Sequence, residues 1–140
     1  MSLRGKIILI TGAAVRVGRA LTLGCVQAGA QVVGKDGSIV NILGWRALRP
    51  GADHLSYTIS KSALAALTQA LAPQIQVNSL TLGDILPPTN HNPSQGLLNS
   101  LPASRWADLD GVVKTLLFLP DEPSYITGDV IHLESGSHMV

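Results

Sequence analysis

The sequence predicts a single α/β domain built around a mostly parallel β-sheet, and three observations carry this prediction. The chain has 140 residues, which is the length of one domain. Residues 7–10 are all aliphatic, and this pattern is typical of a parallel strand that is buried on both faces. A glycine-containing turn follows, and beyond it apolar residues recur at helical spacing. The chain therefore opens as strand, turn and helix.

The later segments continue this alternation. The first helix is expected over residues 17–28, with Gly29 in the position of a C-cap. Residues 84–104 contain four prolines and are expected to form a long loop or lid. Further strands are expected at residues 31–33, 38–42, 76–82 and 129–133, and further helices at residues 57–71, 95–101 and 108–119. Read locally, Asp36 and Gly37 favour a hairpin, which would make the neighbouring strands antiparallel.

Composition excludes several classes of protein. Hydrophobic residues make up 46% of the chain and charged residues 14%, which excludes disorder. The net charge of +1 gives no basic excess that would indicate nucleic acid as a partner. No apolar stretch approaches the ~20 residues of a membrane span, and no targeting segment is evident, so a cytoplasmic protein is expected. Cys25 stands alone and the four histidines show no ligand spacing, so no disulfide and no metal site are expected.

The first candidate site is the turn between Thr11 and Gly18, where a strand is followed by a helix. Gly12 and Gly18 would let backbone N–H groups approach a pyrophosphate at the helix N-terminus. Their spacing differs from the usual G-x-G-x-x-G pattern. The alternative is a tight turn in which the glycines serve only the backbone geometry.

The second candidate site is the pair Tyr57 and Lys61. Residues four apart share one face of a helix, so the lysine ammonium can approach the phenol. An adjacent cation favours the phenolate and lowers a tyrosine pKa that is ordinarily ~10. Such a tyrosine can exchange a proton with a carbonyl or imine. The alternative is a surface pair with no chemical role.

Together and in this order, these motifs resemble the short-chain dehydrogenase/reductase family. The turn from Gly12 to Gly18 is similar to the cofactor turn of that family, and Tyr57-x-x-x-Lys61 to its catalytic pair. Residues 76–83 resemble the strand and glycine loop that follow the catalytic helix, and residues 125–131 resemble the last strand. Arg16 and Leu82 are closest to the pteridine reductase-like subgroup, which uses NADPH.

The resemblance implies a Rossmann-like three-layer fold and an NADP-dependent oxidoreductase that reduces a carbonyl or pterin-like small molecule. Tyr57 would donate the proton, and Lys61 would lower its pKa and hold the nicotinamide ribose. The helix from Tyr57 to Ala72 resembles a subunit interface, which implies a homo-oligomer. The family resemblance also implies the cofactor-binding residues, which are Gly12, Arg16, Val17, Gly18, Tyr57, Lys61, Asn78, Leu82 and Gly83.

The chain also departs from the family, and the expected fold is therefore a truncated one. At ~30 residues per βαβ unit, roughly 90 residues of the first nucleotide-binding half are absent at a junction near residues 33–38. The absent part includes the residue that reads the adenosine ribose and the family's catalytic asparagine. A second junction near residues 92–96 shortens the substrate loop. The family's serine or aspartate, thirteen residues before the tyrosine, is Gly44 in this chain.

Two functions follow from these observations. The intact Tyr57–Lys61 pair favours an active NADP-dependent oxidoreductase. Gly44 and the absent strands favour a catalytically impaired remnant that acts as a nucleotide-binding or oligomerisation module.

Overall fold

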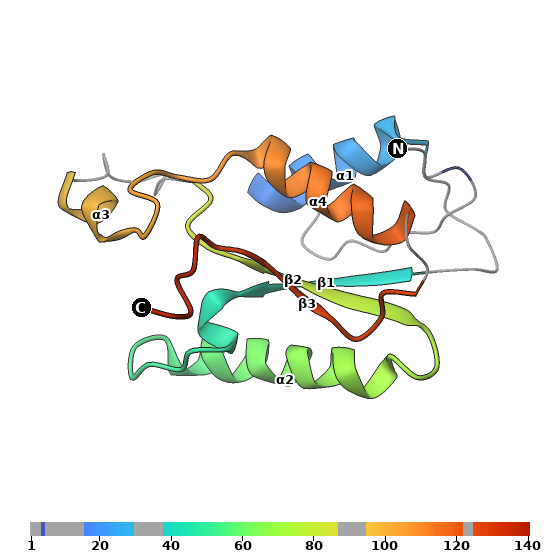
Figure 1. Ribbon diagram of the computed structural model, residues 1–140, viewed down its shortest axis with the longest axis horizontal. Helices are drawn as coiled ribbons and strands as arrows, with labels where there is room; N and C mark the ends of the chain where they lie inside the picture. Colours follow the sequence, from blue (N-terminus) through green and yellow to red (C-terminus); the bar gives the residue numbers. More distant parts are fainter. Residues whose placement is uncertain (1–3, 5–15, 30–37, 87–94, 122–124) are drawn as a thin grey trace.

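The computed structural model describes residues 4, 16–29, 38–86, 95–121 and 125–140. Its helices and strands alternate along the chain (Figure 1) in the order α1 (Arg16–Gln27), β1 (Ser38–Gly44), η1 (Trp45–Ala47), α2 (Leu55–Leu71), β2 (Gln76–Leu82), α3 (Gln95–Ser100), α4 (Leu109–Asp121) and β3 (Val130–Leu133). The strands expected at residues 6–10 and 31–33 lie outside the described residues, as do Gly12, the Asp36–Gly37 turn and most of both junctions.

The described strands form one parallel sheet in the order β1-β2-β3. β1 pairs with β2 from Ser38↔Gln76 to Gly44↔Leu82, and β2 pairs with β3 from Ser79↔Val130 onward. The predicted parallel sheet is confirmed for these strands. β2 lies at the centre and is buried along almost its whole length, as expected of a parallel strand covered on both faces.

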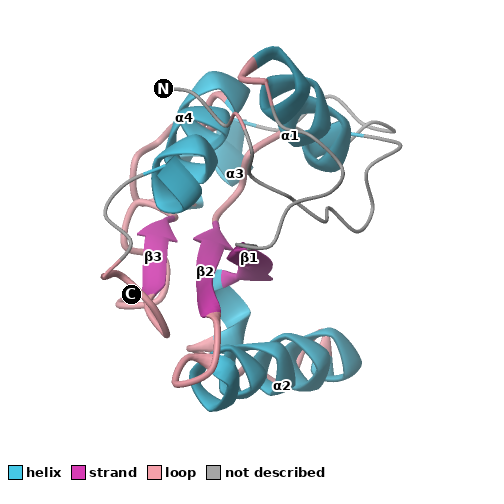
Figure 2. Ribbon diagram, turned by 90° about the vertical axis from the view of Figure 1, so that its right-hand side faces the viewer, coloured by secondary structure: helices cyan, strands magenta, loops and turns pink. Residues whose placement is uncertain are grey.

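Helices cover both faces of this sheet, which gives the predicted three-layer arrangement. α1 and α4 pack side by side over one face, and α2 lies along the other (Figures 1 and 2). The main apolar core fills the space beneath α1 and α4. Its buried members are Leu21, Cys25, Leu80, Leu82, Ile85, Val112 and Leu116.

The contact between α2 and the sheet is more polar. Thr68 of α2 is fully buried, and its hydroxyl meets the side chains of Asn41 on β1 at 2.8 Å and Ser79 on β2 at 2.7 Å. The same oxygen donates to the Leu64 carbonyl at 2.9 Å. This network fixes the position of α2 along the strands, and α2 is the helix that carries Tyr57 and Lys61.

Helix ends follow the local signals in the sequence. Gly29 adopts φ +87°, and its N–H donates to the Val26 carbonyl at 3.0 Å, so α1 ends in the left-handed conformation that glycine favours. At the start of α4, the carboxylate of Asp108 accepts the N–H of Gly111 at 2.6 Å and so acts as an N-cap.

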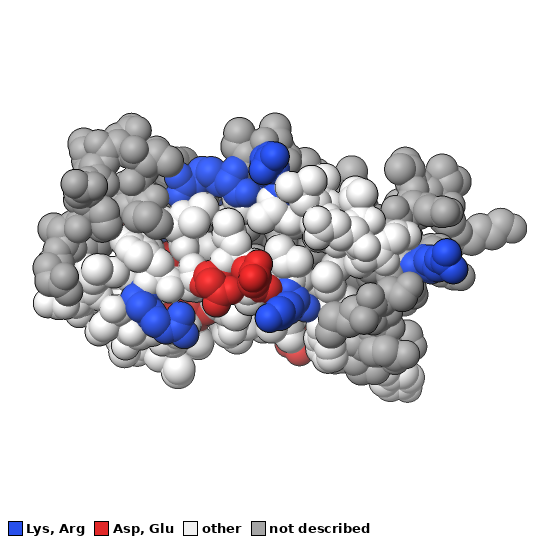
Figure 3. Space-filling model, turned by 90° about the horizontal axis from the view of Figure 1, so that it is seen from above, with Lys and Arg blue, Asp and Glu red and all other residues white. Residues whose placement is uncertain are grey.

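Seen from the side of α1 and α4, acidic and basic side chains occur in separate small groups among uncharged residues (Figure 3). Among the described residues, no helix has both the length and the hydrophobicity to cross a bilayer.

Candidate active site

The candidate site lies at the carboxyl ends of β1 and β2, where α/β folds place their ligands. Gly44 ends β1 and Leu82 ends β2. α2 begins beside them, after His54, which adopts φ 56° as the N-cap. Tyr57 is therefore in the first turn of α2, and Lys61 follows one turn later on the same face.

Lys61 is held by the backbone of β1. Its ammonium donates a hydrogen bond to the Ile42 carbonyl at 2.7 Å and lies 5.8 Å from the centre of the Tyr57 ring. Burial disfavours the charged amine and lowers the pKa of Lys61.

The pKa of Tyr57 is shifted in the opposite direction from the prediction. Burial of its ring raises the pKa of the Tyr57 phenol above 10.0, whereas a lowered pKa was predicted from the neighbouring lysine. The physical reason is that the Lys61 ammonium is hydrogen-bonded to Ile42, so desolvation of the phenol is the dominant effect. In this structure the phenol is a weaker acid than free tyrosine.

Gly44 lies directly against Tyr57. A Cβ atom at Gly44 would collide with the Tyr57 hydroxyl and would approach two of its ring carbons to 3.3 Å. The phenol therefore occupies the space that a side chain at position 44 would need.

A cavity of about 340 Å³ connects this region to the start of α1. Six of the predicted site residues line it, from three separate parts of the chain: Arg16, Val17, Tyr57, Lys61, Leu82 and Gly83. Its other lining residues are Ile42, Leu43, Asp84, Ile85 and Leu86. The structure thus brings together the two motifs that are about 40 residues apart in the sequence.

Two of the remaining predicted site residues, Gly18 and Asn78, are not among the residues that line this cavity. Gly12 is outside the described residues. Gly18 lies on α1, where its carbonyl accepts the Thr22 hydroxyl at 2.9 Å. Asn78 is 1% exposed, and its amide joins β2 to the segment before β3, donating to the Ile126 carbonyl at 2.8 Å and accepting the Asp129 N–H at 3.1 Å. These bonds give Asn78 a structural task away from the cavity.

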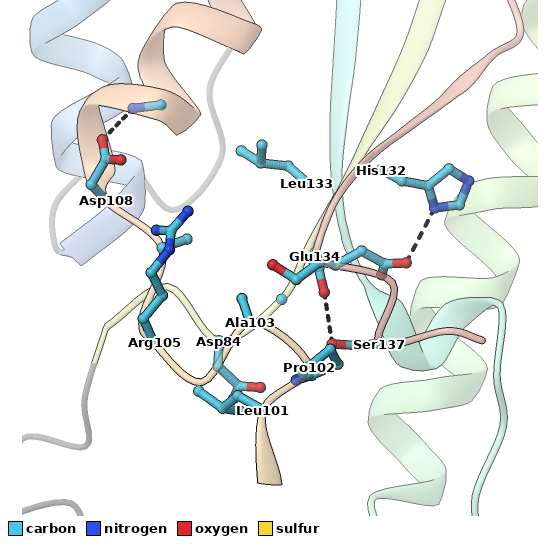
Figure 4. A pocket seen from close by; sticks show the side chains of 14 residues that line it. Asp84, Leu101, Pro102, Ala103, Arg105, Asp108, His132, Leu133, Glu134 and Ser137 are labelled. Carbon is cyan, nitrogen blue, oxygen red and sulfur yellow. Dashed lines mark hydrogen bonds and ion pairs between the residues drawn. The ribbon is translucent and has the colours of Figure 1, made fainter. Parts of the chain in front are cut away.

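Two neighbouring cavities share Gly83 and Asp84 with the first. One is lined by Trp45, Arg46 and His54 beside Tyr57. The other lies between residues 101–111 and the end of the chain, with Arg105 and Asp108 on one wall and His132 and Glu134 on the other (Figure 4).

Sequence reasoning did not single out Arg46, His54 or Asp84. A usable signal existed for Asp84, because it comes directly after a glycine at the carboxyl end of a parallel strand. Arg46 lies 4.4 Å over the Trp45 ring and pairs with Asp53 at 2.5 Å, and no sequence pattern marks that arrangement.

The cavity that contains Arg16, Tyr57 and Lys61 is called the main cavity below. Its donor groups fit a phosphorylated nucleotide cofactor. At one end, the N-terminus of α1 and the exposed Arg16 offer positive potential for phosphate. At the other end, the Tyr57 hydroxyl and the Lys61 ammonium are hydrogen-bond donors for sugar hydroxyls or a carbonyl.

Comparison with known proteins agrees with this arrangement. A family model described as "Enoyl-(Acyl carrier protein) reductase" matches residues 18–138. The (2S)-[(R)-hydroxy(phenyl)methyl]succinyl-CoA dehydrogenase subunit BbsD of Thauera aromatica is 33% identical over 80% of this chain and 50% of its own length. The L-xylulose reductase of Caenorhabditis elegans is 30% identical over 71% of this chain and 45% of its own. The chain belongs to the short-chain dehydrogenase/reductase family.

Solved structures extend the likeness to the fold. The alternative dihydrofolate reductase FolM of Brucella suis, in complex with NADP, superposes with a TM-score of 0.69 at 26% identity, covering 96% of this chain and 64% of that one. A Beutenbergia cavernae structure with bound NADP gives a TM-score of 0.81 at 19% identity, covering 96% and 97% of the two chains, and shares the fold. The Rossmann-like fold is thereby confirmed. The chain spans about half the length of the curated relatives it matches.

Proposed function

We propose that this chain is an NADP-dependent oxidoreductase that reduces a carbonyl or pterin-like small molecule. The observation that carries the proposal is the single cavity in which the N-terminus of α1 meets Tyr57, Lys61 and Gly83. The cavity provides a phosphate-binding end and a proton-donating end in one continuous space. NADP in the related structures supports the cofactor, and the dihydrofolate reductase FolM supports a pterin-like substrate.

In this proposal, different residues of the cavity bind different parts of the cofactor. Arg16 and the backbone N–H groups at the start of α1 hold phosphate, and the guanidinium suits the additional phosphate of NADP. Lys61 donates to the ribose hydroxyls from its position on the Ile42 carbonyl, and Leu82 and Gly83 border the nicotinamide end. NADPH, when bound, supplies the hydride.

Tyr57 supplies the proton. Its side chain is 44% exposed and lines both the main cavity and the cavity that contains Trp45 and Arg46, so a substrate oxygen can reach the hydroxyl. The phenol carries its proton at neutral pH, because burial raises its pKa, so that proton is available to a substrate oxygen. Lys61 remains one helical turn away and completes the pair.

The alternative function is a catalytically impaired remnant that binds nucleotide or forms oligomers. Gly44 supports it, because it offers no side chain to hold a substrate and its Cβ position is filled by the Tyr57 hydroxyl. The outer face of α2 supports the oligomer in either case, because Leu55, Ile59 and Leu67 are exposed by 61%, 60% and 47%. We propose that this face joins copies of the chain in a homo-oligomer. We also propose that the protein works in the cytoplasm.

Calorimetric titration of the purified chain with NADPH is the first test. Saturable binding is expected, and Arg16→Ala should weaken NADPH binding more than NADH binding. Arg19→Ala is the matched control, because Arg19 is exposed on the same helix and is not among the residues that line the cavity. Absence of saturable NADPH binding would contradict both the oxidoreductase and the nucleotide-binding remnant.

Hydride transfer from NADPH to a panel of carbonyl and pterin compounds then separates the two functions. Loss of a positioned proton donor costs typically 10²–10⁴-fold in rate, so Tyr57→Phe should be slower by about that factor. Tyr125→Phe is the control, because Tyr125 is 97% exposed. A wild-type chain that binds NADPH but is no faster than Tyr57→Phe would establish the remnant instead.

A further inference from the structure

We propose that His132, Glu134 and His138 form a binding site for a divalent transition metal of the Zn²⁺ type. His132 lies on β3, Glu134 comes directly after β3, and His138 is near the end of the chain. One nitrogen of each imidazole and one oxygen of the carboxylate lie within 4.8 Å of one another. Imidazole nitrogens with a carboxylate oxygen are a ligand set that Zn²⁺ prefers.

The backbone after β3 creates this cluster. Ser135 and Gly136 have φ of 54° and 81°, and the chain turns back on itself. The turn is closed by Ser137, whose N–H and hydroxyl both donate to the Glu134 carbonyl, at 3.1 Å and 2.7 Å. This turn brings His138 back over the residue four positions earlier. The cluster therefore combines the two-residue spacing of His132 and Glu134 at the end of β3 with the turn that follows.

The carboxylate of Glu134 is the observation that points to a cation. Its side chain is 0% exposed, so bulk water does not solvate it. Oε1 meets Nδ1 of both histidines, at 3.3 Å for His132, whereas Oε2 is buried and has no hydrogen-bond partner among the described residues. A buried ionised carboxylate is costly unless it is fully paired. A metal ion held by both oxygens of the carboxylate would compensate Oε2 as well as Oε1.

The two imidazoles lie together against the same carboxylate oxygen. Their rings stack with centroids 4.3 Å apart and planes 25° apart, and both present Nδ1 to the same carboxylate oxygen. Two imidazole nitrogens and one carboxylate oxygen are thereby gathered within reach of a single cation.

Access to the cluster is open. His132 and Glu134 line the cavity of about 170 Å³ shown in Figure 4, and the His132 and His138 side chains are 40% and 26% exposed. Because the Glu134 side chain is 0% exposed, an ion would reach the carboxylate past the partly exposed His132 and His138 rings. A water molecule can then complete a four-coordinate Zn²⁺ as its fourth ligand.

Titration of the chelator-treated chain with ZnCl₂, without nucleotide, tests the site by calorimetry. We expect one Zn²⁺ per chain and a higher melting temperature with Zn²⁺. His138→Ala should weaken Zn²⁺ binding by more than the 10–100-fold that loss of an outer-shell partner costs. His138 lies in a turn after β3 and its side chain is 26% exposed, so this variant is expected to fold, and circular dichroism checks that it does.

His54→Asn is the matched control, because His54 is exposed at the N-cap of α2, outside the cluster, and asparagine tolerates its left-handed backbone. This variant should bind Zn²⁺ like the wild type. No saturable binding by the wild type, or equal binding by His138→Ala, would overturn the metal site. Because no cofactor is used, the result is independent of the oxidoreductase proposal.

Discussion

Replacing Thr68 by valine tests how α2, and with it Tyr57 and Lys61, is held against the sheet. A hydroxyl has one proton and two lone pairs. The Thr68 proton goes to the Leu64 carbonyl at 2.9 Å, so its two lone pairs accept from Asn41 at 2.8 Å and from Ser79 at 2.7 Å. Valine retains the shape of threonine but removes this oxygen, and both donors lose their acceptor.

The magnitude follows from the burial of the two donors. Leaving a buried polar group without a partner costs about 1–3 kcal/mol. Ser79 is 0% exposed and bears this cost in full, whereas Asn41 is half-buried and can partly recover through water. We expect Thr68→Val to lower the free energy of unfolding by about 2–3 kcal/mol. At about 2.1 cal/mol/K per residue, that is a loss of about 7–10 °C in Tm for a chain of this length.

Urea denaturation followed by circular dichroism measures this loss, and the midpoint should fall with an unchanged m-value. Thr68→Ser is the control, because it keeps the hydroxyl and removes one methyl group, which costs about 1 kcal/mol. A Thr68→Val chain within about 0.5 kcal/mol of the wild type would refute the reasoning, since that is the range of ordinary surface substitutions. So would a Thr68→Ser chain that is the less stable of the two.

In a Tyr125→Phe chain Tyr57 is the remaining tyrosine, and its phenolate absorbance should titrate with a midpoint above 10.0, because burial raises its pKa. Its folded pKa exceeds the unfolded one, so its contribution to stability is present below pH 10 and is lost as the pH rises through the folded value; a midpoint below 10.0 would show that Lys61 dominates after all. Gly83→Ala should destabilise the chain by about 1–3 kcal/mol in thermal melts, because its Cβ would lie 2.9 Å from the Glu134 Cα atom, and backbone does not give way easily. Gly111→Ala is the matched control: its nearest neighbours are Asp108 carboxylate atoms at 3.5 Å and alanine favours the helix, so equal losses from both variants would contradict the argument from close approach.

Much of the fold could be predicted from local patterns. β2 occupies the expected residues 76–82, because a proline-containing turn precedes the strand and Gly83 follows it, which leaves little choice of boundary. α1 was expected over residues 17–28 and is Arg16–Gln27, since its apolar spacing and Gly29 both mark it. β1 continues two residues beyond the expected 38–42, because pairing with β2 extends to Gly44.

The candidate site was less predictable because it depends on where side-chain atoms point. The helical spacing of Tyr57 and Lys61 put both on one face, but it did not show that the Lys61 ammonium would bond to the Ile42 carbonyl. The direction of the Tyr57 pKa was therefore predicted wrongly. The histidines gave no signal either, because a loop brings His138 to Glu134, and the sequence spacing does not reveal that turn.

The contact between Gly44 and Tyr57 couples the residue types that these two positions can hold. The family that this chain resembles has a serine or an aspartate at the place of Gly44, whereas here any Cβ would collide with the Tyr57 hydroxyl. A serine at position 44 therefore requires the partly exposed Tyr57 side chain to move aside. The two positions are coupled, and directed evolution of this chain should vary position 44 together with the surroundings of Tyr57.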